Sequence, residues 1–283
     1  MAEGSLEQLV EQAREGNRAA LEEVVRQVQD RIYGLALRML YHPADAEDAT
    51  QEILIKIVTR LDGFRGESAF TTWVWRVASN HLLTTRKRRA ERAAVSFDYY
   101  AEQIEKGLAA SEPHQPPEGE QALIVEEIRT SCLQGLLLCL DRPQRLAYVL
   151  TEVFGIGGDQ AAWILDVSPE AFRQRLSRAR RRLRDFLLKH CGLLDPANPC
   201  QCARVVPMAV ETGWIDPDRP LFTRLSCRAR QDPLDPERLA DLDELARVAE
   251  LFRSQPDYDP PEGLLGDIKR ILNGGDPSRP LDA

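Results

Sequence analysis

Residues 45–89 read DAEDATQEILIKIVTRLDGFRGESAFTTWVWRVASNHLLTTRKRR, and this stretch decides how the first part of the chain folds. After an acidic start, apolar residues return every three or four positions: Ile53, Ile57, Val58 and Leu61. That spacing predicts an amphipathic helix, and Asp45 is the expected N-cap. A loop marked by glycine follows, in which Gly66 can take backbone angles closed to other residues.

The second half of this stretch predicts another helix. It carries Trp73 and Trp75 near its start and four basic residues, 86–89, at its end. Flat aromatic faces beside a cationic run are typical of proteins that bind unstacked bases on a phosphate backbone. The alternative interpretation is an ordinary helical hairpin, with its tryptophans in the core and a solvated basic end.

Length and composition indicate a globular protein with several small domains. The chain has 283 residues, of which 43% are hydrophobic and 29% charged. No apolar run approaches the roughly 20 residues needed to span a bilayer. The first residues, MAEGSLEQLVEQAREG, lack the basic and apolar regions of a signal peptide. We therefore expect a cytoplasmic protein without membrane insertion.

The distribution of charge matters more than its sum. The net charge of −8 argues, taken alone, against a nucleic-acid partner. Residues 168–190, however, contain eight basic and two acidic side chains, whereas residues 191–283 contain 11 basic and 17 acidic ones. This asymmetry predicts a basic nucleic-acid-binding segment followed by an acidic tail.

Helical periodicity divides the chain into four parts. Helices are expected over 5–29, with a break at Gly16-Asn17, over 32–40, and over the two halves of the opening stretch. Together they predict a helical domain over residues 1–95. Residues 96–120 hold three prolines and six acids against one lysine, which favours a flexible acidic linker. A second helical domain is expected over 121–190, followed by a mostly helical or irregular extension, 191–283. The predicted fold class is all-α.

The second domain contains a helix-turn-helix pattern. A short helix ends near Leu165, a tight turn follows, and Ser168 with Pro169 begins a new helix. Arginine and glutamine on its outer face suit guanine and adenine edges in the major groove, and the remaining arginines suit phosphates. A solvated basic helix is the alternative.

Two whole patterns are more specific than their parts. D-A-E-D-x-x-Q-E with F-R-G-E-S-A-F-x-T-W-V-W-R-V-A resembles conserved region 2 of bacterial sigma factors of the extracytoplasmic-function group. The segment LDRPQRLAYVLTEVFGIGGDQAAWILDVSPEAFRQRLSRARRRL looks like region 4 of the same group. The resemblance covers about residues 1–190 and implies a non-enzymatic factor that directs RNA polymerase to promoters. The chain departs from the family pattern at Leu54 and Gln160.

The resemblance also implies site residues and partners. Contacts to the clamp helices of core RNA polymerase are implied for Asp45, Asp48, Gln51, Glu52 and Ile55. Contacts to the −10 element are implied for Phe64, Arg65, Ser68, Phe70, Thr72, Trp73, Arg76, Asn80, Arg86, Lys87 and Arg88. Contacts to the −35 element are implied for Ser168, Glu170, Arg173, Gln174, Arg175, Arg178 and Arg180. Core polymerase, through its clamp helices and flap, and promoter DNA are the implied partners, and an anti-sigma factor would be a further one.

The extension carries a group of metal-type ligands outside the sigma pattern. His190, Cys191, Cys200, Cys202 and Cys227 could bind zinc, or copper as a softer site. A single C-x-C lacks the paired spacing of common zinc modules, so a thiol redox pair and inert reduced thiols stay as alternatives. No cofactor is otherwise required. We expect the acidic extension to regulate the sigma domains.

Two other functions compete with promoter recognition. A free-standing helix-turn-helix regulator with a metal- or redox-sensing tail explains residues 159–184 but leaves the opening stretch unexplained. A metal-dependent enzyme finds no support, because the chain has no glycine-rich phosphate loop, His-Glu metal helix or nucleophile motif. No catalytic residue is predicted.

Overall fold

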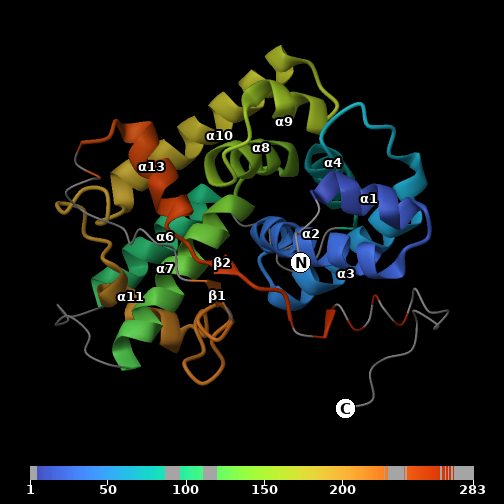
Figure 1. Cartoon of the computed structure of the whole chain (residues 1–283). Coiled ribbons are helices and arrows are strands. Elements are labelled where there is room, and N and C mark those ends of the chain that lie inside the picture. Colours follow the sequence, from blue (N-terminus) through green and yellow to red (C-terminus); the bar gives the residue numbers. More distant parts are fainter. Residues whose placement is uncertain are drawn as a thin grey trace.

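The computed structural model is built of helices packed around one continuous core, which confirms the predicted all-α class (Figure 1). It describes residues 5–86, 96–110, 120–225, 227–228, 239 and 241–261, with positions 263, 264, 266, 268 and 270. In these parts the strands are β1 (Cys227–Arg228) and β2 (Asp257–Tyr258), which pair antiparallel.

The first helical domain begins with α1 (Leu6–Arg14) and α2 (Arg18–Leu40). Ser5 caps α1 in a capping box with Gln8. The predicted break at Gly16-Asn17 is confirmed, because Gly16 has φ +93° and Asn17 caps α2. The two helices expected over 17–29 and 32–40 form one, since nothing between them interrupts the backbone ladder.

The opening stretch forms α3 (Pro43–Thr59), the 3₁₀ turn η1 (Leu61–Gly63) and α4 (Phe70–Thr84). The expected cap at Asp45 was wrong: His42 is the N-cap of α3, its side chain accepting from the Ala44 amide, and Pro43 opens the helix. Pro is favourable there because its missing N–H has no partner in the first turn. Asp45 lies in the first turn, where it complements the helix dipole.

Residues expected to form a flexible linker include the helix α6 (Phe97–Ala110). Its apolar side packs on the rest of the chain: Ile104 is buried and the Phe97 ring lies 5.5 Å from that of Phe186. Three of the acidic residues that suggested disorder, Asp98, Glu102 and Glu105, are exposed on this helix, and Glu102 pairs with Lys106. Residues 111–119 lie outside the described part.

The second helical domain consists of α7 (Glu120–Leu138), α8 (Arg142–Tyr148), the π-helical turn η2 (Val149–Val153), α9 (Gly158–Ile164) and α10 (Pro169–His190). Helices α9 and α10 form the predicted helix-turn-helix, with Asp166 at φ +54° in the turn. The apolar stripe expected on α10 is buried at Phe172, Leu176, Ala179 and Leu183.

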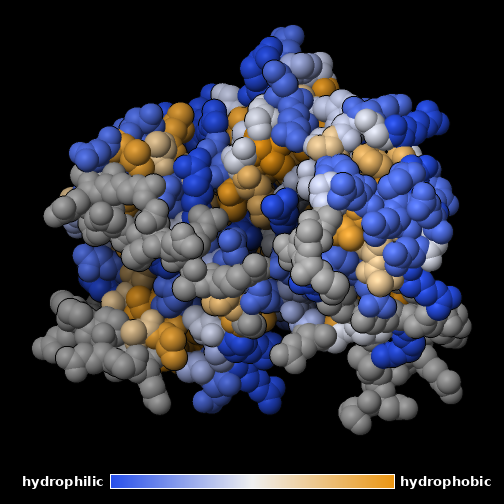
Figure 2. Space-filling view, viewed as in Figure 1, coloured by the Kyte–Doolittle hydropathy of each residue, from blue (hydrophilic) through white to orange (hydrophobic). Residues whose placement is uncertain are grey.

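The extension folds back on both domains. It contains α11 (Cys202–Glu211) and α13 (Glu244–Arg253) besides the two short strands. Helix α11 packs on α6 and α7, α13 lies along α10, and β2 contacts α2 (Figure 1). Figure 2 shows a mainly hydrophilic face on which apolar side chains gather around α8 and near α11. Described residues of the extension, such as Phe222, Leu251 and Phe252, therefore contribute to the core.

Arginines of the second domain cap helix ends of the first. Arg145 is 3% exposed and donates to the carbonyl of Met39 at the end of α2, as well as to Leu137 and Leu140 at the end of α7. Arg142 donates to the Leu83 and Thr85 carbonyls at the end of α4, at 3.3 and 2.5 Å. Carbonyls at helix C-termini lack intrahelical partners, so these guanidinium groups satisfy them while joining the domains.

Candidate nucleic-acid and polymerase interface

Helix α3 carries the predicted polymerase contacts on one outer stripe. Its inner face is buried at Ile53, Leu54 and Ile57, which leaves the opposite face to solvent. Asp48 and Glu52 are exposed, and the other three predicted contacts are half-buried: Asp45, Gln51 and Ile55. Their three- and four-residue spacing brings these five residues to one side of the helix. The stripe is acidic with an apolar edge.

The loop between η1 and α4 is built around an aromatic group. Phe64 packs edge-on against Phe70, with ring centroids 5.3 Å apart, and 5.7 Å from Trp73. Gly66 has φ +69°, which confirms the predicted need for glycine. Phe70 is fully buried, so in this arrangement its ring supports the loop and is closed to a base. Arg65 is exposed at the tip and Ser68 is half-buried beside it.

A cationic cavity of about 610 Å³ lies between α3 and α4. Three predicted −10 residues line it, Trp73, Arg76 and Asn80, together with Lys56 and Arg60 from the end of α3. The described residues that line this cavity include no acid. An aromatic face, an amide and three cations around one hollow suit an extruded base and its phosphates.

Sequence reasoning missed the four other polar lining residues of this cavity: Lys56, Arg60, His81 and Thr84. Their spacing could have revealed them, because residues 56 and 60, and residues 73, 76, 80 and 84, follow one face of each helix. His81 is 5% exposed and lies between two charged groups. Its Nδ1 is 2.5 Å from the Lys56 ammonium and its Nε2 is 3.6 Å from the carboxylate of Glu52. His81 therefore connects Glu52 of the predicted polymerase-contact stripe with Lys56 in the cavity.

Helix α10 presents the predicted −35 residues on its N-terminal half. Ser168 caps the helix, its hydroxyl accepting from the Ala171 amide at 3.2 Å. Exposed positions are Ser168, Glu170, Arg173, Gln174 and Arg178, and Arg175 is half-buried. Within the described part of the chain, none of the arginines 173, 175 and 178 has an ion-pair or hydrogen-bond partner. This half of the helix therefore offers uncompensated cations to a phosphate backbone.

Arg180 is engaged differently from the other predicted −35 residues. It donates through Nε to the carboxylate of Glu152 in η2, at 2.7 Å, and also through Nη2. Arg253 of the extension binds the same carboxylate from the other side, at 3.2 Å. The Glu152 side chain is only 9% exposed, so both guanidiniums compensate a nearly buried charge. In this arrangement the Arg180 guanidinium is engaged by Glu152, although its side chain is 40% exposed.

Helix α9 lies on α4, directly beside the cationic cavity. Arg76 binds the Asp166 carboxylate at 2.8 Å and lies over the Trp163 ring, 4.6 Å from its centroid. Gln160 donates its amide to the hydroxyl of Thr72 at 2.7 Å. Thr72 is 5% exposed as a result, and two predicted −10 residues are occupied by the second domain. Gln160, where the chain departs from the family pattern, supplies one of these contacts.

Of the predicted basic run, Arg86 is exposed at the end of α4. Lys87 and Arg88 lie outside the described residues, so their predicted contacts stay predictions.

The structure brings three of the five predicted metal ligands together and adds a fourth thiol. Burial, with a smaller contribution from neighbouring Cys191, raises the pKa of Cys200 and of Cys202 to about 12. Burial also raises the pKa of Cys132 on α7 well above its usual value, with Cys200, Cys191 and Cys202 contributing in the same direction. These four residues, 132, 191, 200 and 202, are called the thiol cluster below.

The remaining two predicted ligands lie elsewhere. Cys227 is exposed and pairs with Tyr258 across the two strands. The His190 ring packs against Phe186, and burial, with the charge of Lys189, lowers its pKa. In the described part of the chain, no three His, Cys, Asp or Glu side chains are arranged to hold a metal ion. Spacing alone could not reveal Cys132, which is 59 residues from Cys191 in sequence.

Family comparisons match both halves of this interface. The sigma-70 region 2 model matches residues 24–92, and the sigma-70 region 4 model matches residues 130–183. The RNA polymerase sigma-H factor of Pseudomonas aeruginosa is 32% identical over 178 residues, which cover 62% of this chain and 89% of that protein. The chain belongs to the sigma-70 family of RNA polymerase sigma factors. It is of the extracytoplasmic-function group, as the sequence predicted.

The chain is also similar to a second curated protein and to two solved structures. The ECF RNA polymerase sigma-E factor of Escherichia coli K12 is 34% identical over 176 residues, covering 61% of this chain and 88% of that one. Among solved structures, CnrH in complex with the cytosolic domain of CnrY matches with a TM-score of 0.41 and 25% identity, over 63% of this chain and 94% of that one. RpoE of Bartonella quintana in complex with the anti-sigma factor NepR matches at 0.39 and 20%, over 59% and 95%.

This sigma factor is a non-enzymatic protein that directs transcription initiation by RNA polymerase, and core polymerase and promoter DNA are its partners. No helix among the described residues is both long and apolar enough to cross a membrane.

Proposed function

We propose that this sigma factor acts in the cytoplasm through three surfaces. We further propose that its extension, while docked on both domains, holds α9 against α4 and so keeps these surfaces from binding until polymerase is engaged; this state is called the closed arrangement below. The α3 stripe would bind the clamp helices, the cavity between α3 and α4 would hold a −10 base, and the N-terminal half of α10 would read the −35 element. The observation that carries the proposed DNA binding is the cavity between α3 and α4, whose described lining residues include cations and an aromatic ring but no acid.

Individual roles follow from side-chain chemistry. Trp73 offers a flat face for stacking, Asn80 an amide for a base edge, and Arg60 and Arg76 cations for phosphates. On α10, Arg173 and Gln174 have forked donors and acceptors that match guanine and adenine edges. Phe70 and Thr72 would act by shaping the loop rather than by touching DNA, because both are buried.

Closure by the extension is supported by where it binds. Four backbone N–H contacts from Leu221, Phe222 and Thr223 converge on the buried carboxylate of Glu127 in α7, at 2.7–3.1 Å. Farther along, the Pro256 carbonyl accepts from Arg38 in α2 at 3.5 Å. The extension thus holds the second domain at one point and the first domain at another.

The closed arrangement and promoter binding compete for the same groups. Arg76 cannot bind Asp166 and a phosphate at once, and Arg180 cannot reach DNA while it compensates Glu152. The extension would therefore lower activity by stabilising contacts that DNA must replace. A separate anti-sigma factor, if one binds this chain, would have to join or displace the extension, because the extension already covers α7 and α10.

The thiol cluster is a proposed sensing element of the extension. A thiophilic ion such as zinc or copper(I) would have to deprotonate thiols whose pKa is raised and draw their side chains together. Metal analysis of the purified protein before and after Cys200→Ser and Cys202→Ser tests this directly. If the unsubstituted protein and both variants, all produced with added metal, contain equally little metal, the thiols serve only in packing.

The decisive experiment is transcription from a randomised promoter library with core RNA polymerase, using the full chain and a chain lacking residues 191–283. Start sites that share −35 and −10 elements, and that core alone ignores, are expected with both proteins. The truncated chain should give more transcript. Arg173→Ala should relax the −35 motif and Asn80→Ala the −10 motif, whereas Arg219→Ala, an exposed residue of the extension, should change neither. Output from the truncated chain that equals or falls below that of the full chain would refute closure.

A further inference from the structure

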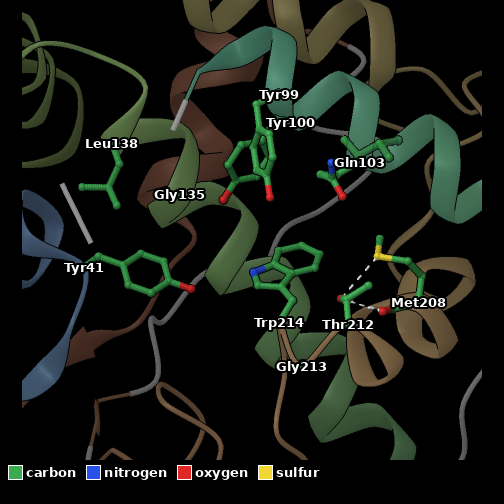
Figure 3. A pocket seen from close by; sticks show the side chains of 11 residues that line it. Tyr41, Tyr99, Tyr100, Gln103, Gly135, Leu138, Met208, Thr212, Gly213 and Trp214 are labelled. Carbon is green, nitrogen blue, oxygen red and sulfur yellow. Dashed lines mark hydrogen bonds between the residues drawn. The ribbon is translucent and has the colours of Figure 1, made fainter. Parts of the chain in front are cut away.

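A second cavity, of about 370 Å³, lies where all four parts of the chain meet (Figure 3). Tyr41 reaches it from the end of α2, Tyr100 and Gln103 from α6, Gly135 from α7, and Trp214 from the turn after α11. None of its described lining residues is a predicted polymerase or DNA contact, and its volume falls within the range of about 300–1,000 Å³ typical of small-molecule sites.

Two glycines shape this cavity by letting helices approach closely. A Cβ at Gly135 would lie 1.6 Å from the Tyr100 hydroxyl, so that phenol rests on the α7 backbone. A Cβ at Gly107 would lie 2.7 Å from the Met208 methyl, so α11 rests on the α6 backbone in the same way. Only glycine fits at either place without movement of the neighbouring side chain or backbone. The helices around the cavity therefore pack closely against one another, and the cavity lies between these close contacts.

The lining is aromatic and uncharged. Figure 3 shows Tyr99 and Tyr100 pointing from α6 towards the Trp214 indole, with Tyr41 approaching the indole from the left. No charged residue is among the described residues that line the cavity, so an ionised ligand would lose hydration without compensation. Rings of this kind bind planar apolar molecules by stacking and edge-on contact.

Hydrogen-bond donors face the same space. Burial raises the pKa of Tyr100 well above its usual value, and burial raises that of Tyr41, partly offset by hydrogen bonding with Ser131 and Trp214. Both phenols are therefore protonated at neutral pH and can donate. The Gln103 amide adds two more donor hydrogens, and within the described part of the chain it has no hydrogen-bond partner. Donors outnumber groups that only accept.

We propose that this cavity binds a small, uncharged, planar aromatic molecule that carries a hydrogen-bond acceptor, and that its occupancy stabilises the closed arrangement. Tyr41 belongs to the first domain and Trp214 to the extension, so their joint contacts exist only while the extension is docked. A ligand that needs both shifts the population towards the closed form, and polymerase binding must then weaken the ligand by the same factor. The regulatory part of this inference rests on the proposed closure, whereas the binding site itself does not.

The test uses three neutral bicyclic probes with a ring acceptor, namely chromone, coumarin and quinoline, against the intact protein. Saturation-transfer NMR and calorimetry should show one saturable site for at least one probe and none for naphthalene-2-sulfonate, which has similar size but is charged. Tyr99→Ala and Gln103→Leu, at exposed and half-buried positions, should each weaken binding about tenfold. Glu102→Gln, exposed on the same helix but outside the cavity, should leave the affinity unchanged. Circular dichroism melts of all three variants confirm that they fold.

Two results would overturn the site: no saturable binding of any probe up to its solubility limit, or binding that Tyr99→Ala and Gln103→Leu leave unchanged. Adding core RNA polymerase should release the bound probe from the full chain. Retention of the probe with unchanged affinity would refute its link to closure while leaving the site intact. Failure of closure itself would show separately, as equal transcription from the full and truncated chains without any probe.

Discussion

Replacing Arg253 by alanine should release the extension from the second domain and raise activity. Arg253 lies at the end of α13 and donates through Nε to the Glu152 carbonyl at 2.5 Å and through Nη2 to its carboxylate at 3.2 Å. Its third interaction, an ion pair with Glu250 at 3.6 Å, is within α13 and survives undocking. Two interactions are therefore specific to the docked state.

The size of the effect follows from the exposure of these groups. A hydrogen bond to a charged group contributes about 1.5–3 kcal/mol when buried. Arg253 is 38% exposed, so solvent screening reduces this, and Arg180 continues to compensate the carboxylate after the substitution. A loss of about 1–2 kcal/mol is expected, which is a factor of about 5–30 in the docking equilibrium.

Affinity for core RNA polymerase and single-round transcription from a selected promoter measure this shift. Arg253→Ala should raise both quantities by at most the factor by which it weakens docking. The rise is smaller if only part of the unsubstituted protein is in the closed arrangement. Arg219→Ala is the matched control, because it removes the same charge from an exposed position of the extension. The double variant with Glu152→Gln should show less than the sum of the single effects, since both remove one interaction. If Arg253→Ala behaves like Arg219→Ala, or lowers polymerase affinity, Arg253 does not hold the protein closed.

Three further predictions concern separate parts of the structure. Asp166→Asn should weaken docking of α9 on α4 by only about 0.2–1 kcal/mol, because the carboxylate is 76% exposed. Fluorescence energy transfer between the labelled domains should report this difference between the variant and the unsubstituted protein at low salt, and the difference should disappear at high salt. Gly135→Ala should lower the free energy of unfolding by about 1–3 kcal/mol in urea titrations, because its methyl group would collide with Tyr100; an unchanged value would contradict the packing. The thiols of Cys200 and Cys202 have a pKa raised from 9.0 to about 12, so the unfolded chain loses these protons first and stability should fall as pH rises from about 9 towards 12. Urea titrations at pH 8 and 10 should show this fall, and Cys200→Ser should make it smaller.

Local patterns predicted the sigma domains well because each depends on residues close in sequence. The four-residue return of apolar side chains defined α3, and the Ser168-Pro169 pair defined the start of α10. Gly66 was recognisable because few other residues tolerate its positive φ. The cap of α3 was misplaced, since Asp45 and His42 compete for that role and the position of Pro43 decides between them.

Contacts between distant residues were beyond sequence reasoning. The capping of α2 by Arg145 joins residues 106 positions apart, and Arg76 and Asp166 are 90 positions apart. Phe70 illustrates the same limit within one domain: an aromatic residue near a cationic helix end is compatible with stacking on a base and with burial, and only packing distinguishes them. The role of α6 was hidden because residues 96–120 were read as one acidic, proline-containing segment, whereas the apolar residues at its start form a helix that packs on the core.

The polar contacts that α9 makes with α4 are individually weak, and this has a consequence for how the two domains separate. Contacts such as Arg76 with Asp166 and Gln160 with Thr72 are each about 1 kcal/mol or less, so no single phosphate or base contact needs to be strong to replace one. Polymerase, by binding the α3 stripe and separating the domains, would remove all of them together. Coupling between sites is reciprocal. If docking of the extension lowers the affinity for polymerase by some factor, bound polymerase must lower the docking equilibrium constant of the extension by the same factor. Under the proposed closure, a signal that acts on the extension alone would set promoter output without touching any residue proposed to read DNA.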